Sequence, residues 1–327
     1  MDWLEQHWYR SGLVSNLLAP LGWVYCLMAT LRRGLYRSGM LRSERLPIPV
    51  IVVGNITVGG TGKTPLVIYL ARYLITLGYL PGIVTRGYGG RSSTWPQDVG
   101  SDSEPDLIGD EPLLLARHAS CPVVADPDRV RAARRLLDAH RCDVVLADDG
   151  LQHYRLARDL EIAVIDGARR LGNGRCLPAG PLRELPGRLA AVDARVVNGV
   201  AHPGELGMAL MVTAFHRLMG GQTLSADHYR GQRVHAVAGI GNPQRFFATL
   251  RGLGVTVIEH AFPDHHRYTR ADVAFDDDLP ILMTEKDAVK CQSFADARMA
   301  YLAVRAQVDP GLEELIMRKL KERSSGR

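Results

Sequence analysis

Residues 53–65 read VGNITVGGTGKTP, a segment with four glycines that ends in Lys-Thr-Pro. The backbone N–H groups of such a loop can close around an anion, and a following helix points the positive end of its dipole at the same place. A lysine at the end of the loop reaches the terminal phosphates of a nucleotide, and the next hydroxyl coordinates Mg²⁺. We therefore predict a phosphate-binding site formed by Thr57, Gly59, Gly60, Thr61, Gly62, Lys63 and Thr64.

The flanking residues predict the setting that such a loop needs. The run PIPVIVVG before the loop is β-branched and bounded by prolines, which is typical of a buried parallel strand. Residues 66–77 carry apolar side chains at helical spacing and stop at Gly78. The loop departs from the usual Gly-x4-Gly-Lys-[Ser/Thr] pattern at Thr57, where Gly59 and Gly60 would supply the missing freedom. An ordinary flexible turn is the alternative, but one of the chain's few lysines falls at the required position.

Two acidic residues follow another strand-like run. Asp148 and Asp149 lie at the end of the segment DVVLADDG, and ligands of open α/β sheets gather at the carboxyl ends of strands. In a protein with a phosphate-binding loop, a carboxylate at this place holds Mg²⁺ directly or through water. A solvated acidic turn is the alternative, and the glycine loop favours the metal site.

Two further clusters are ambiguous on the residues alone. Asp110 and Glu111 in GDEP precede the helical pattern LLLARH, and carboxylates favour the positive end of a helix. The segment FPDHHRY places Asp264 beside His265 and His266. Histidine suits proton transfer near neutral pH, and a carboxylate can hold its tautomer. A helix start and a polar loop are nevertheless sufficient explanations of these clusters.

The N-terminal region carries a long apolar run. Residues 13–31 are almost entirely apolar, with a proline and a glycine in mid-run, and arginines follow at positions 32, 33, 37, 42 and 45. Several Trp and Tyr residues in this region favour a membrane interface. We expect a helical segment that lies in or dips into a cytoplasmic membrane face, held by arginines against anionic headgroups. A full span and a helix hairpin buried in the core are the alternatives, and a cleaved targeting segment is not expected.

Composition sets further limits on function. The net charge of +5 is modest and no basic stripe is interleaved with aromatics, so we expect no nucleic-acid partner. The cysteines, at positions 26, 121, 142, 176 and 291, are scattered and lack Cys-x-x-Cys spacing. We therefore expect neither disulfides nor structural zinc, and a reducing cytosolic compartment.

The order of the apolar runs predicts the fold class. Short apolar runs alternate with helix-like segments from GIVTRGY to ARVVNG, and a second set begins at VHAVAGIG. Such alternation indicates parallel sheets with helices on both faces. We expect an α/β protein with a P-loop NTPase-like parallel-sheet domain over residues 46–205. A smaller α/β domain is expected over residues 206–327, and the membrane-associated helical segment over residues 1–45.

Seven separated motifs indicate a family. In order they are VGNITVGGTGKTP, TRGYGG, GDEP, DDGLQH, LPAGPLRE, FPDHHRY and TEKDAVK. Together, after an apolar N-terminal segment, they resemble the tetraacyldisaccharide 4'-kinase family of lipid A biosynthesis, over about residues 10–290. In that family, ATP donates its γ-phosphate to the 4'-hydroxyl of a tetraacylated glucosamine disaccharide at the inner face of the bacterial inner membrane.

The resemblance implies roles for individual residues. The ATP phosphates would lie on residues 59–64, with Lys63 also catalytic. The Mg²⁺ site would be formed by Thr64, Asp148, Asp149 and Glu184. Asp110 and His265 would activate the acceptor hydroxyl, although the choice between His265 and His266 depends on register. The other implied cleft residues are Arg86, Arg129, Gln152, His153, Arg183 and His266; a helix-start ion pair would explain Arg129 equally well.

The resemblance also implies the partners, and one other class of protein competes with it. The implied partners are the lipid A precursor disaccharide and the lipid surface of the inner membrane, with no protein partner. The alternative is a membrane-associated P-loop GTPase or ATPase switch that acts on a protein. The segment TEKD at 284–287 is similar to the Asn-Lys-x-Asp guanine motif but lacks its Asn. A switch would turn over nucleotide with water or a protein partner, whereas a kinase would need the lipid hydroxyl.

Overall fold

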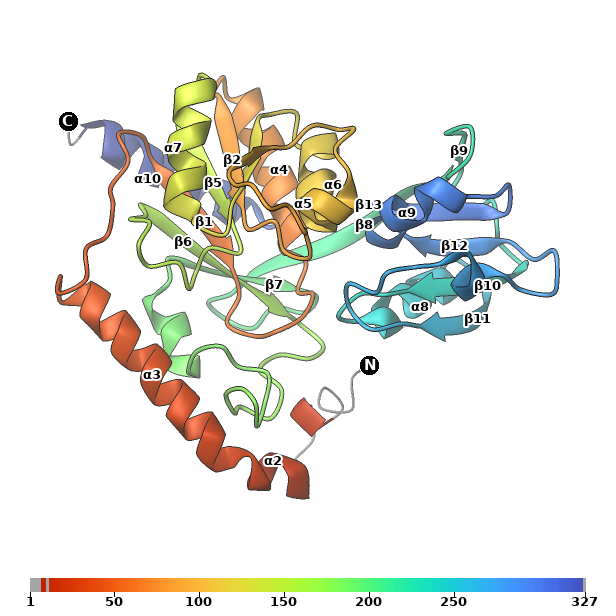
Figure 1. The fold of residues 1–327 in the computed structure, drawn as a ribbon, viewed down its shortest axis with the longest axis horizontal. Coiled ribbons are helices and arrows are strands. Elements are labelled where there is room, and N and C mark those ends of the chain that lie inside the picture. Colours follow the sequence, from red (N-terminus) through yellow and green to blue (C-terminus); the bar gives the residue numbers. More distant parts are fainter. Residues whose placement is uncertain (1–6, 10–11, 326–327) are drawn as a thin grey trace. The chain divides into compact units, whose positions relative to one another are not determined.

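A parallel sheet organises the larger of the two units into which the chain divides (Figure 1). The computed structural model describes residues 7–9 and 12–325. The larger unit takes in the described residues up to Ala209 and those from Gln307 onward, and the smaller unit is Leu210–Ala306. The C-terminal residues thus pack with the larger unit. The expected functional division, with boundaries near residues 45 and 205, stays a prediction.

The sheet of the larger unit has the strand order β7-β6-β1-β5-β2-β4-β3. Its strands run parallel, except that the short β3 is antiparallel to β4. Every residue of β1, β2 and β5 is buried, as expected for strands covered on both faces. The bounds are β1 Val50–Gly54, β2 Pro81–Thr85, β3 Gln97–Asp98, β4 Val123–Ala125, β5 Val144–Asp148, β6 Leu160–Asp166 and β7 Ala194–Asn198.

Helices cover this sheet. Helix α4 (Lys63–Thr76) packs against β1, β2 and β5 and contacts α6 (Asp110–His118), which follows the short α5 (Pro105–Ile108). Helix α7 (Arg129–Ala139) packs on β2 and β4. The C-terminal α10 (Pro310–Ser325) is joined to α4 by a hydrogen bond from the Tyr69 hydroxyl to Glu313, and a 3₁₀ helix spans Pro186–Ala191.

In the smaller unit, strands pair in parallel in the order β11-β10-β12-β13. Helix α8 (Pro243–Gly252) packs Phe246 and Phe247 into one core cluster, and Tyr268 lies in another. Strands β8 (Leu206–Arg217) and β13 (Met299–Val308) each pass from one unit to the other. The remaining bounds are β9 Thr223–Leu224, β10 Arg233–Ala238, β11 Thr256–Ala261, β12 Ile281–Thr284, α9 Glu285–Cys291, and 3₁₀ turns at Arg270–Val273 and Gln292–Phe294. The predicted α/β class with parallel sheets is confirmed.

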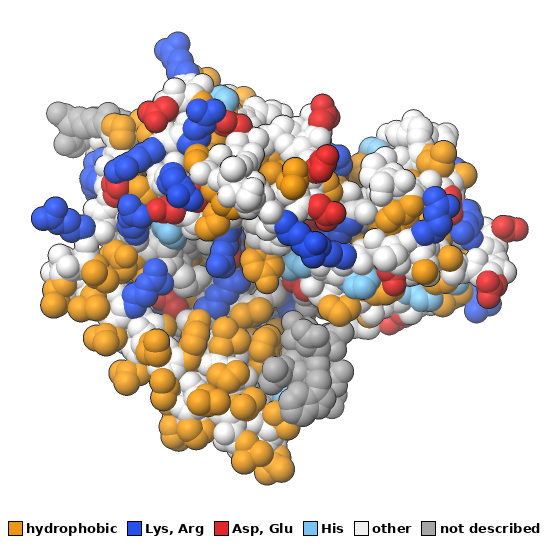
Figure 2. Space-filling view, viewed as in Figure 1, with side chains coloured by type: hydrophobic (Ala, Val, Ile, Leu, Met, Phe, Trp, Pro, Cys, Tyr) orange, Lys and Arg blue, Asp and Glu red, His pale blue; other side chains and the backbone are white. Residues whose placement is uncertain are grey.

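The N-terminal apolar run forms two helices of the larger unit. Helix α2 (Leu13–Leu17) is followed by its C-cap residue Leu18, and α3 (Ala19–Arg37) has Pro20 in its first turn, where a missing N–H is tolerated. Ala19 and Gly22 are the buried residues of α3, so the interpretation as a buried hairpin is wrong. Figure 2 shows apolar side chains gathered over this helix. Within the described residues, no helix combines the length and the hydropathy needed to cross a membrane.

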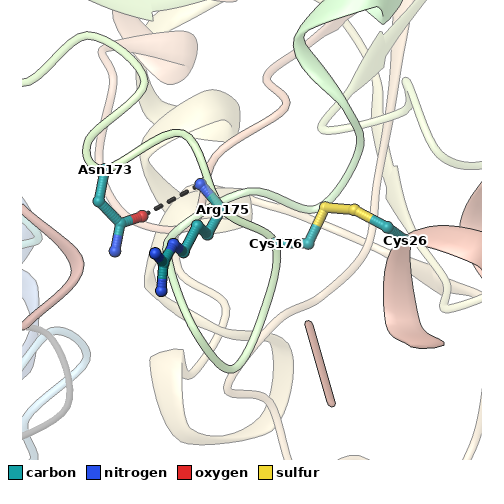
Figure 3. The surroundings of a disulfide bond; sticks show 4 residues. All are labelled: Cys26, Asn173, Arg175 and Cys176. Atoms are coloured by element: carbon teal, nitrogen blue, oxygen red, sulfur yellow. Dashed lines mark hydrogen bonds between the residues drawn. A yellow bond between two sulfur atoms is a disulfide. The ribbon is translucent and has the colours of Figure 1, made fainter. Parts of the chain in front are cut away.

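A disulfide joins α3 to a loop of the larger unit (Figure 3). Cys26 and Cys176 have Cα atoms 6.0 Å apart. One helical turn before Cys26, a Cβ on Gly22 would lie 3.0 Å from the Cys176 carbonyl oxygen, so glycine permits this close approach. The loop is shaped by Asn173, whose Oδ1 accepts a hydrogen bond from the Arg175 backbone N (3.1 Å). The expectation of no disulfide is wrong, because packing of α3 brings together cysteines that lie 150 residues apart in sequence.

Candidate active site

The glycine loop joins β1 to α4, as predicted. Strand β1 ends at Gly54 and α4 begins at Lys63, which is 9% exposed. Gly62 has φ +97°, and a Cβ on it would lie 2.6 Å from Asn198 Nδ2. A glycine satisfies both requirements. The loop therefore delivers a nearly buried ammonium to the start of a helix.

Thr57 stands where the usual motif has its first glycine, and the structure shows why a glycine is not needed there. Thr57 pairs with Leu182 in an antiparallel bridge and does not have a positive φ. The next residue, Val58, donates its backbone N–H to the Pro181 carbonyl oxygen (2.8 Å). This part of the loop is therefore extended. The pairing also ties the loop to the LPAGPLRE segment, which carries Arg183.

Two residues that the sequence analysis did not single out hold the loop. Asn198, the last residue of β7, donates from Nδ2 to the Thr61 carbonyl oxygen (3.1 Å). Arg169 donates from Nη2 to the Gly60 carbonyl oxygen (2.8 Å) and from Nε to Asp166 (3.2 Å), the last residue of β6. Both lie at or just beyond the carboxyl end of a strand in the same sheet as β1. The rule that ligands gather at these ends would have found them.

The two predicted aspartates lie at the end of β5, beside the loop. Lys63 Nζ lies 3.6 Å from Asp149 Oδ1, and Arg183 Nη1 donates to both Asp149 oxygens (3.1 and 2.9 Å). Asp148 is 1% exposed. The Thr85 hydroxyl donates to Asp148 Oδ2 (3.2 Å), whereas Asp148 Oδ1 is buried and has no hydrogen-bond partner. The structure therefore brings Lys63 and both aspartates together at one edge of the sheet.

The two neighbouring carboxyls have opposite pKa shifts. Burial and the nearby Glu111 carboxylate raise the pKa of Asp148 to about 7. Burial also disfavours the Asp149 carboxylate, but the charges of Lys63 and Arg183 outweigh burial and hold the pKa of Asp149 well below its usual range. At neutral pH, Asp149 is ionised and Asp148 is divided between its two forms. Binding of a cation at Asp148 would therefore release a proton from the protonated fraction.

Arg129 is a buried cation that supports the end of β5. Its guanidinium donates to the carbonyl oxygens of Asp126 (3.2 Å), Asp148 (3.2 Å) and Asp149 (3.4 Å). Burial lowers the pKa of Arg129 to about 10, and the positive charge of Arg86 acts in the same direction. Arg129 stays charged at neutral pH. It begins α7, but its hydrogen bonds go to the backbone of the site.

Glu184 and Gln152 form a polar group beside the start of the loop. Gln152 Nε2 donates to Glu184 Oε2 (2.9 Å) and to the Asn55 carbonyl oxygen (3.0 Å), and the Tyr154 hydroxyl donates to Glu184 Oε1. Burial and neighbouring arginines lower the pKa of His153 to about 4, so His153 is neutral at pH 7. Both oxygens of Glu184 accept hydrogen bonds from the protein, and direct binding of a metal would have to displace them.

Asp110 and Glu111 begin α6. Asp110 is 5% exposed, and its Oδ1 accepts a hydrogen bond from the Glu111 backbone N (2.9 Å). Gly109 has φ +94°, and a Cβ on it would lie 2.2 Å from the Tyr88 carbonyl oxygen. Glycine thus lets GDEP pack directly on the TRGYGG segment. Since Glu111 raises the pKa of Asp148, GDEP also lies close to the strand-end aspartates.

The two predicted histidines lie in the smaller unit, and their side chains contact different residues. His265 has φ +59°, and its Nε2 lies 3.3 Å from Lys286 Nζ and 3.8 Å from Asp264 Oδ1. His266 instead stacks on Phe262, with ring centroids 4.6 Å apart. His265 therefore stays our choice for chemistry, and His266 packs the loop. The partnership of His265 with a carboxylate of the larger unit stays a prediction.

A family model described as tetraacyldisaccharide-1-P 4'-kinase matches residues 14–321. The chain belongs to this family. Relatives named tetraacyldisaccharide 4'-kinase are 54% identical in Alkalilimnicola ehrlichii (96% of each chain), 46% in Nitrosococcus oceani (98% of this chain, 97% of the relative) and 51% in Pseudomonas aeruginosa (93% and 92%). A crystal structure of "apo" form LpxK from Aquifex aeolicus in complex with ATP has a TM-score of 0.79 at 29% identity, over 94% of this chain and 100% of that chain. The resemblance predicted from the motifs is confirmed.

The carboxylate oxygens at the end of β5 fit Mg²⁺ in part. Within the described residues, no group of three or more His, Cys, Asp or Glu side chains is arranged to hold a metal ion. A kinase does not need such a cage, because Mg²⁺ is bound by one or two carboxylates together with substrate phosphates and water. The partnerless, buried Oδ1 of Asp148 is an oxygen ligand of the kind that Mg²⁺ takes.

The raised pKa of Asp148 predicts how Asp148→Asn changes stability in the absence of ligands. Between about pH 4 and pH 7, folded wild-type protein keeps a proton that the unfolded chain releases, so wild-type stability falls as the pH rises. The asparagine does not titrate. The variant should therefore gain stability relative to wild type across this window, by at most about 4 kcal/mol, and the gain should level off above pH 7.

Urea unfolding at pH 5 and pH 8 measures this difference, with the exposed Asp102→Asn as the matched control. A difference between wild type and Asp148→Asn that stays the same at both pH values would contradict the raised pKa.

Proposed function

We propose that this protein is an ATP-dependent kinase that phosphorylates the 4'-hydroxyl of a tetraacylated glucosamine disaccharide 1-phosphate in lipid A biosynthesis. The observation that carries the proposal is the buried Lys63 at 3.6 Å from Asp149, next to the glycine loop, in a chain that a kinase family model matches over residues 14–321. The structure of the relative from Aquifex aeolicus is described as a complex with ATP, which supports ATP as the donor here.

The charges around the loop suit phosphoryl transfer. This reaction needs little covalent work from a protein, but it needs positioning and charge stabilisation. We assign Lys63 and the backbone of residues 59–64 to the ATP phosphates. Arg183 would lie near these phosphates, because it pairs with Asp149, which lies beside Lys63. Thr64 and Asp148 would hold Mg²⁺, which when bound neutralises charge on the phosphate oxygens. Glu184 would then act on the metal through Gln152 and ordered water, because its oxygens already accept hydrogen bonds.

The acceptor hydroxyl is assigned to Asp110 and His265. A nearly buried carboxylate can take the proton of the hydroxyl, and an imidazole N–H can hydrogen-bond to a carboxylate that does so. Arg86 and Arg129 add positive charge near the strand-end aspartates, in keeping with a site for anionic substrates. Gln152 of the DDGLQH motif supports the start of the loop through the Asn55 carbonyl oxygen, and we keep its neighbour His153 as a residue of the proposed substrate cleft.

The proposed location is the cytoplasmic face of the bacterial inner membrane. A tetraacylated acceptor stays in the bilayer, so the enzyme must reach it there. One side of α3 contacts the site region: Cys26 is bonded to Cys176, and Arg32 donates to the Gln152 carbonyl oxygen (3.3 Å). The other side is apolar and exposed, with Leu21, Trp23, Val24, Leu27, Met28 and Leu31 at 56–72% exposure. We propose that this apolar face of α3 lies in the membrane interface beside the site.

A nucleotide-driven switch is not favoured. The family match names a kinase, and the Asp287 of TEKD is not available to read a base. Asp287 is fully buried, and its carboxylate accepts hydrogen bonds from the Gly239 backbone N (3.1 Å) and the Thr284 hydroxyl (2.6 Å). No nucleic-acid or protein partner is proposed.

Lys63→Ala should lower the transfer of γ-phosphate from ATP to the lipid by roughly 10²- to 10³-fold or more, because a positioned charge on the reacting phosphates is lost. The fold should persist, since Arg183 still pairs with Asp149. Transfer is measured with radiolabelled ATP and purified acceptor. The exposed Lys321→Ala is the matched control, and near-normal transfer by Lys63→Ala would show that the loop is only a turn.

Asp110→Asn and His265→Ala should each lower kcat by ~10²- to 10⁴-fold and spare nucleotide affinity, because the residues act on the acceptor. If they work as one unit, the double variant should be scarcely slower than the slower single variant. Steady-state kinetics and nucleotide binding without lipid measure this. If the kcat losses of the two single variants multiply in the double variant, the two residues act independently. Loss of nucleotide binding in Asp110→Asn would assign that carboxylate to Mg²⁺.

Leu27→Glu with Met28→Glu should weaken binding to vesicles of anionic phospholipid by roughly 10²-fold or more, since each buried large apolar side chain contributes about 1.5–3 kcal/mol. Both side chains are exposed, so the fold should not change. Sedimentation with vesicles measures binding, and Met219→Glu, an exposed methionine of the smaller unit, is the control. Equal binding of wild type and the double variant would show that α3 is not the anchor.

A further inference from the structure

The TEKDAVK motif, residues 284–290, has no part in the function proposed above. It lies where β12 ends at Thr284 and α9 begins at Glu285. The Thr284 hydroxyl caps this helix by accepting the Asp287 backbone N–H (3.2 Å). The Asp287 carboxylate is buried and also accepts from Lys290 Nζ (3.3 Å). These bonds hold the first turn of α9 in one conformation, and Lys286 lies in that turn.

The Lys286 ammonium bridges two residues of the FPDHHRY segment. Lys286 Nζ lies 3.2 Å from Asp264 Oδ1 and 3.3 Å from His265 Nε2. The same Asp264 oxygen accepts the His265 backbone N–H (3.0 Å). Two of these contacts involve His265, and the third joins its two partners to each other. The φ of His265, +59°, is uncommon for a residue with a side chain. A lysine in the first turn of a helix gains nothing from the helix dipole, so the local helix does not account for Lys286.

The chemistry of the ammonium determines the tautomer of the ring. A lysine ammonium has three donors and no acceptor. In its hydrogen bond with Lys286, the His265 Nε2 atom must therefore be the acceptor, and a neutral His265 ring carries its proton on Nδ1. The identity of the nitrogen that bears the proton sets whether the ring offers a donor or an acceptor to a reacting group.

We propose that Lys286 is a positioning residue that holds the His265 imidazole in one orientation and as the Nδ1–H tautomer. Lys286 acts through His265 and does not touch the reacting atoms. Because Nε2 accepts from Lys286, the ring can act on the acceptor hydroxyl or on its carboxylate base only as a donor, through Nδ1–H. The inference rests on the proposed function in one respect, namely that His265 acts on the acceptor hydroxyl.

The test uses Lys286→Met, which removes the ammonium and keeps an unbranched chain, and Lys286→Arg, which keeps a charged group that only donates. Full-length protein with ¹⁵N-labelled histidine reports the tautomer of each ring by NMR, and His265→Gln assigns the His265 signals. Lys321→Met is the matched control, because Lys321 is an exposed lysine of another helix, α10. kcat, KM and nucleotide affinity are measured for every variant.

We expect a single Nδ1–H tautomer of His265 in wild type and a shift toward Nε2–H in Lys286→Met. kcat should fall by about 10- to 100-fold, as is typical when a partner that orients a functional histidine is removed, with nucleotide affinity unchanged. Lys286→Arg should keep the tautomer and recover much of kcat. Lys321→Met should keep the wild-type tautomer.

Each contrary result has its own meaning. An Nε2–H tautomer in wild type, or an unchanged tautomer in Lys286→Met, overturns the inference about Lys286 even if His265→Ala is inactive. A tautomer shift in Lys286→Met with full kcat in both Lys286→Met and His265→Ala overturns the proposed role of His265 and with it the catalytic purpose of Lys286. The NMR readout thus separates failure of the inference from failure of the proposed function.

Discussion

Burial of opposite charges at the carboxyl edge of one sheet is the constraint on which the larger unit depends. Three charged residues at this edge are buried, namely Lys63, Asp148 and Arg129. Asp149 is partly exposed and lies beside Lys63, and Arg129 donates to the Asp148 carbonyl oxygen. A buried charge without a partner costs several kcal/mol, so each has to be matched by a neighbour. Asp149 is matched by Lys63 and Arg183, whereas Asp148 has one partnerless oxygen and a raised pKa. The unmatched oxygen marks the place where a cation would complete the arrangement.

The backbone around these charges is built to keep them in place. Gly62 leaves room for Asn198, which holds the Thr61 carbonyl oxygen, and Arg169 holds the next carbonyl along the chain at Gly60. The segment that carries Arg183 is paired with the start of the loop. A displacement of the loop would therefore break contacts with β6, β7 and the LPAGPLRE segment together. Preorganisation of this kind is what a reaction that depends on charge stabilisation requires.

Helix α3 is attached to segments that carry residues of the candidate site. The position of α3 at a membrane would therefore also set the position of the site. The helix is joined through Cys26 to the loop that leads to Arg183 and Glu184, and through Arg32 to Gln152. An apolar face that enters a membrane would hold these residues at a set depth relative to the lipid. The acceptor would then need to rise only partly out of the bilayer, because its acyl chains can stay in the hydrocarbon region.

Patterns of neighbouring residues in the sequence predicted the elements around the glycine loop. The strand before the loop, the helix after it and the aspartates at the end of β5 each follow from periodicity, glycine and the place where ligands gather. Family resemblance added Asp110 and His265, which composition and spacing left ambiguous.

The remaining features depend on tertiary contacts that a local pattern does not contain. The Cys26–Cys176 bond requires α3 to pack on a loop distant in sequence, and Arg169 and Asn198 matter because β6 and β7 lie beside β1. Thr57 is tolerated in the loop because Leu182 pairs with it. The packing of the C-terminal helix with the larger unit likewise follows from contacts such as Tyr69 with Glu313.

Nucleotide turnover with and without the acceptor is the most direct test of whether this protein is a lipid kinase. Wild-type protein is given γ-labelled ATP and Mg²⁺, with a tetraacylated glucosamine disaccharide 1-phosphate in detergent micelles, with its 4'-deoxy analogue, or with micelles alone. We expect label to enter the lipid in step with ADP formation, and we expect both to stop with the analogue and with empty micelles. Equal ADP formation in all three samples, with no label in the lipid, would contradict this expectation.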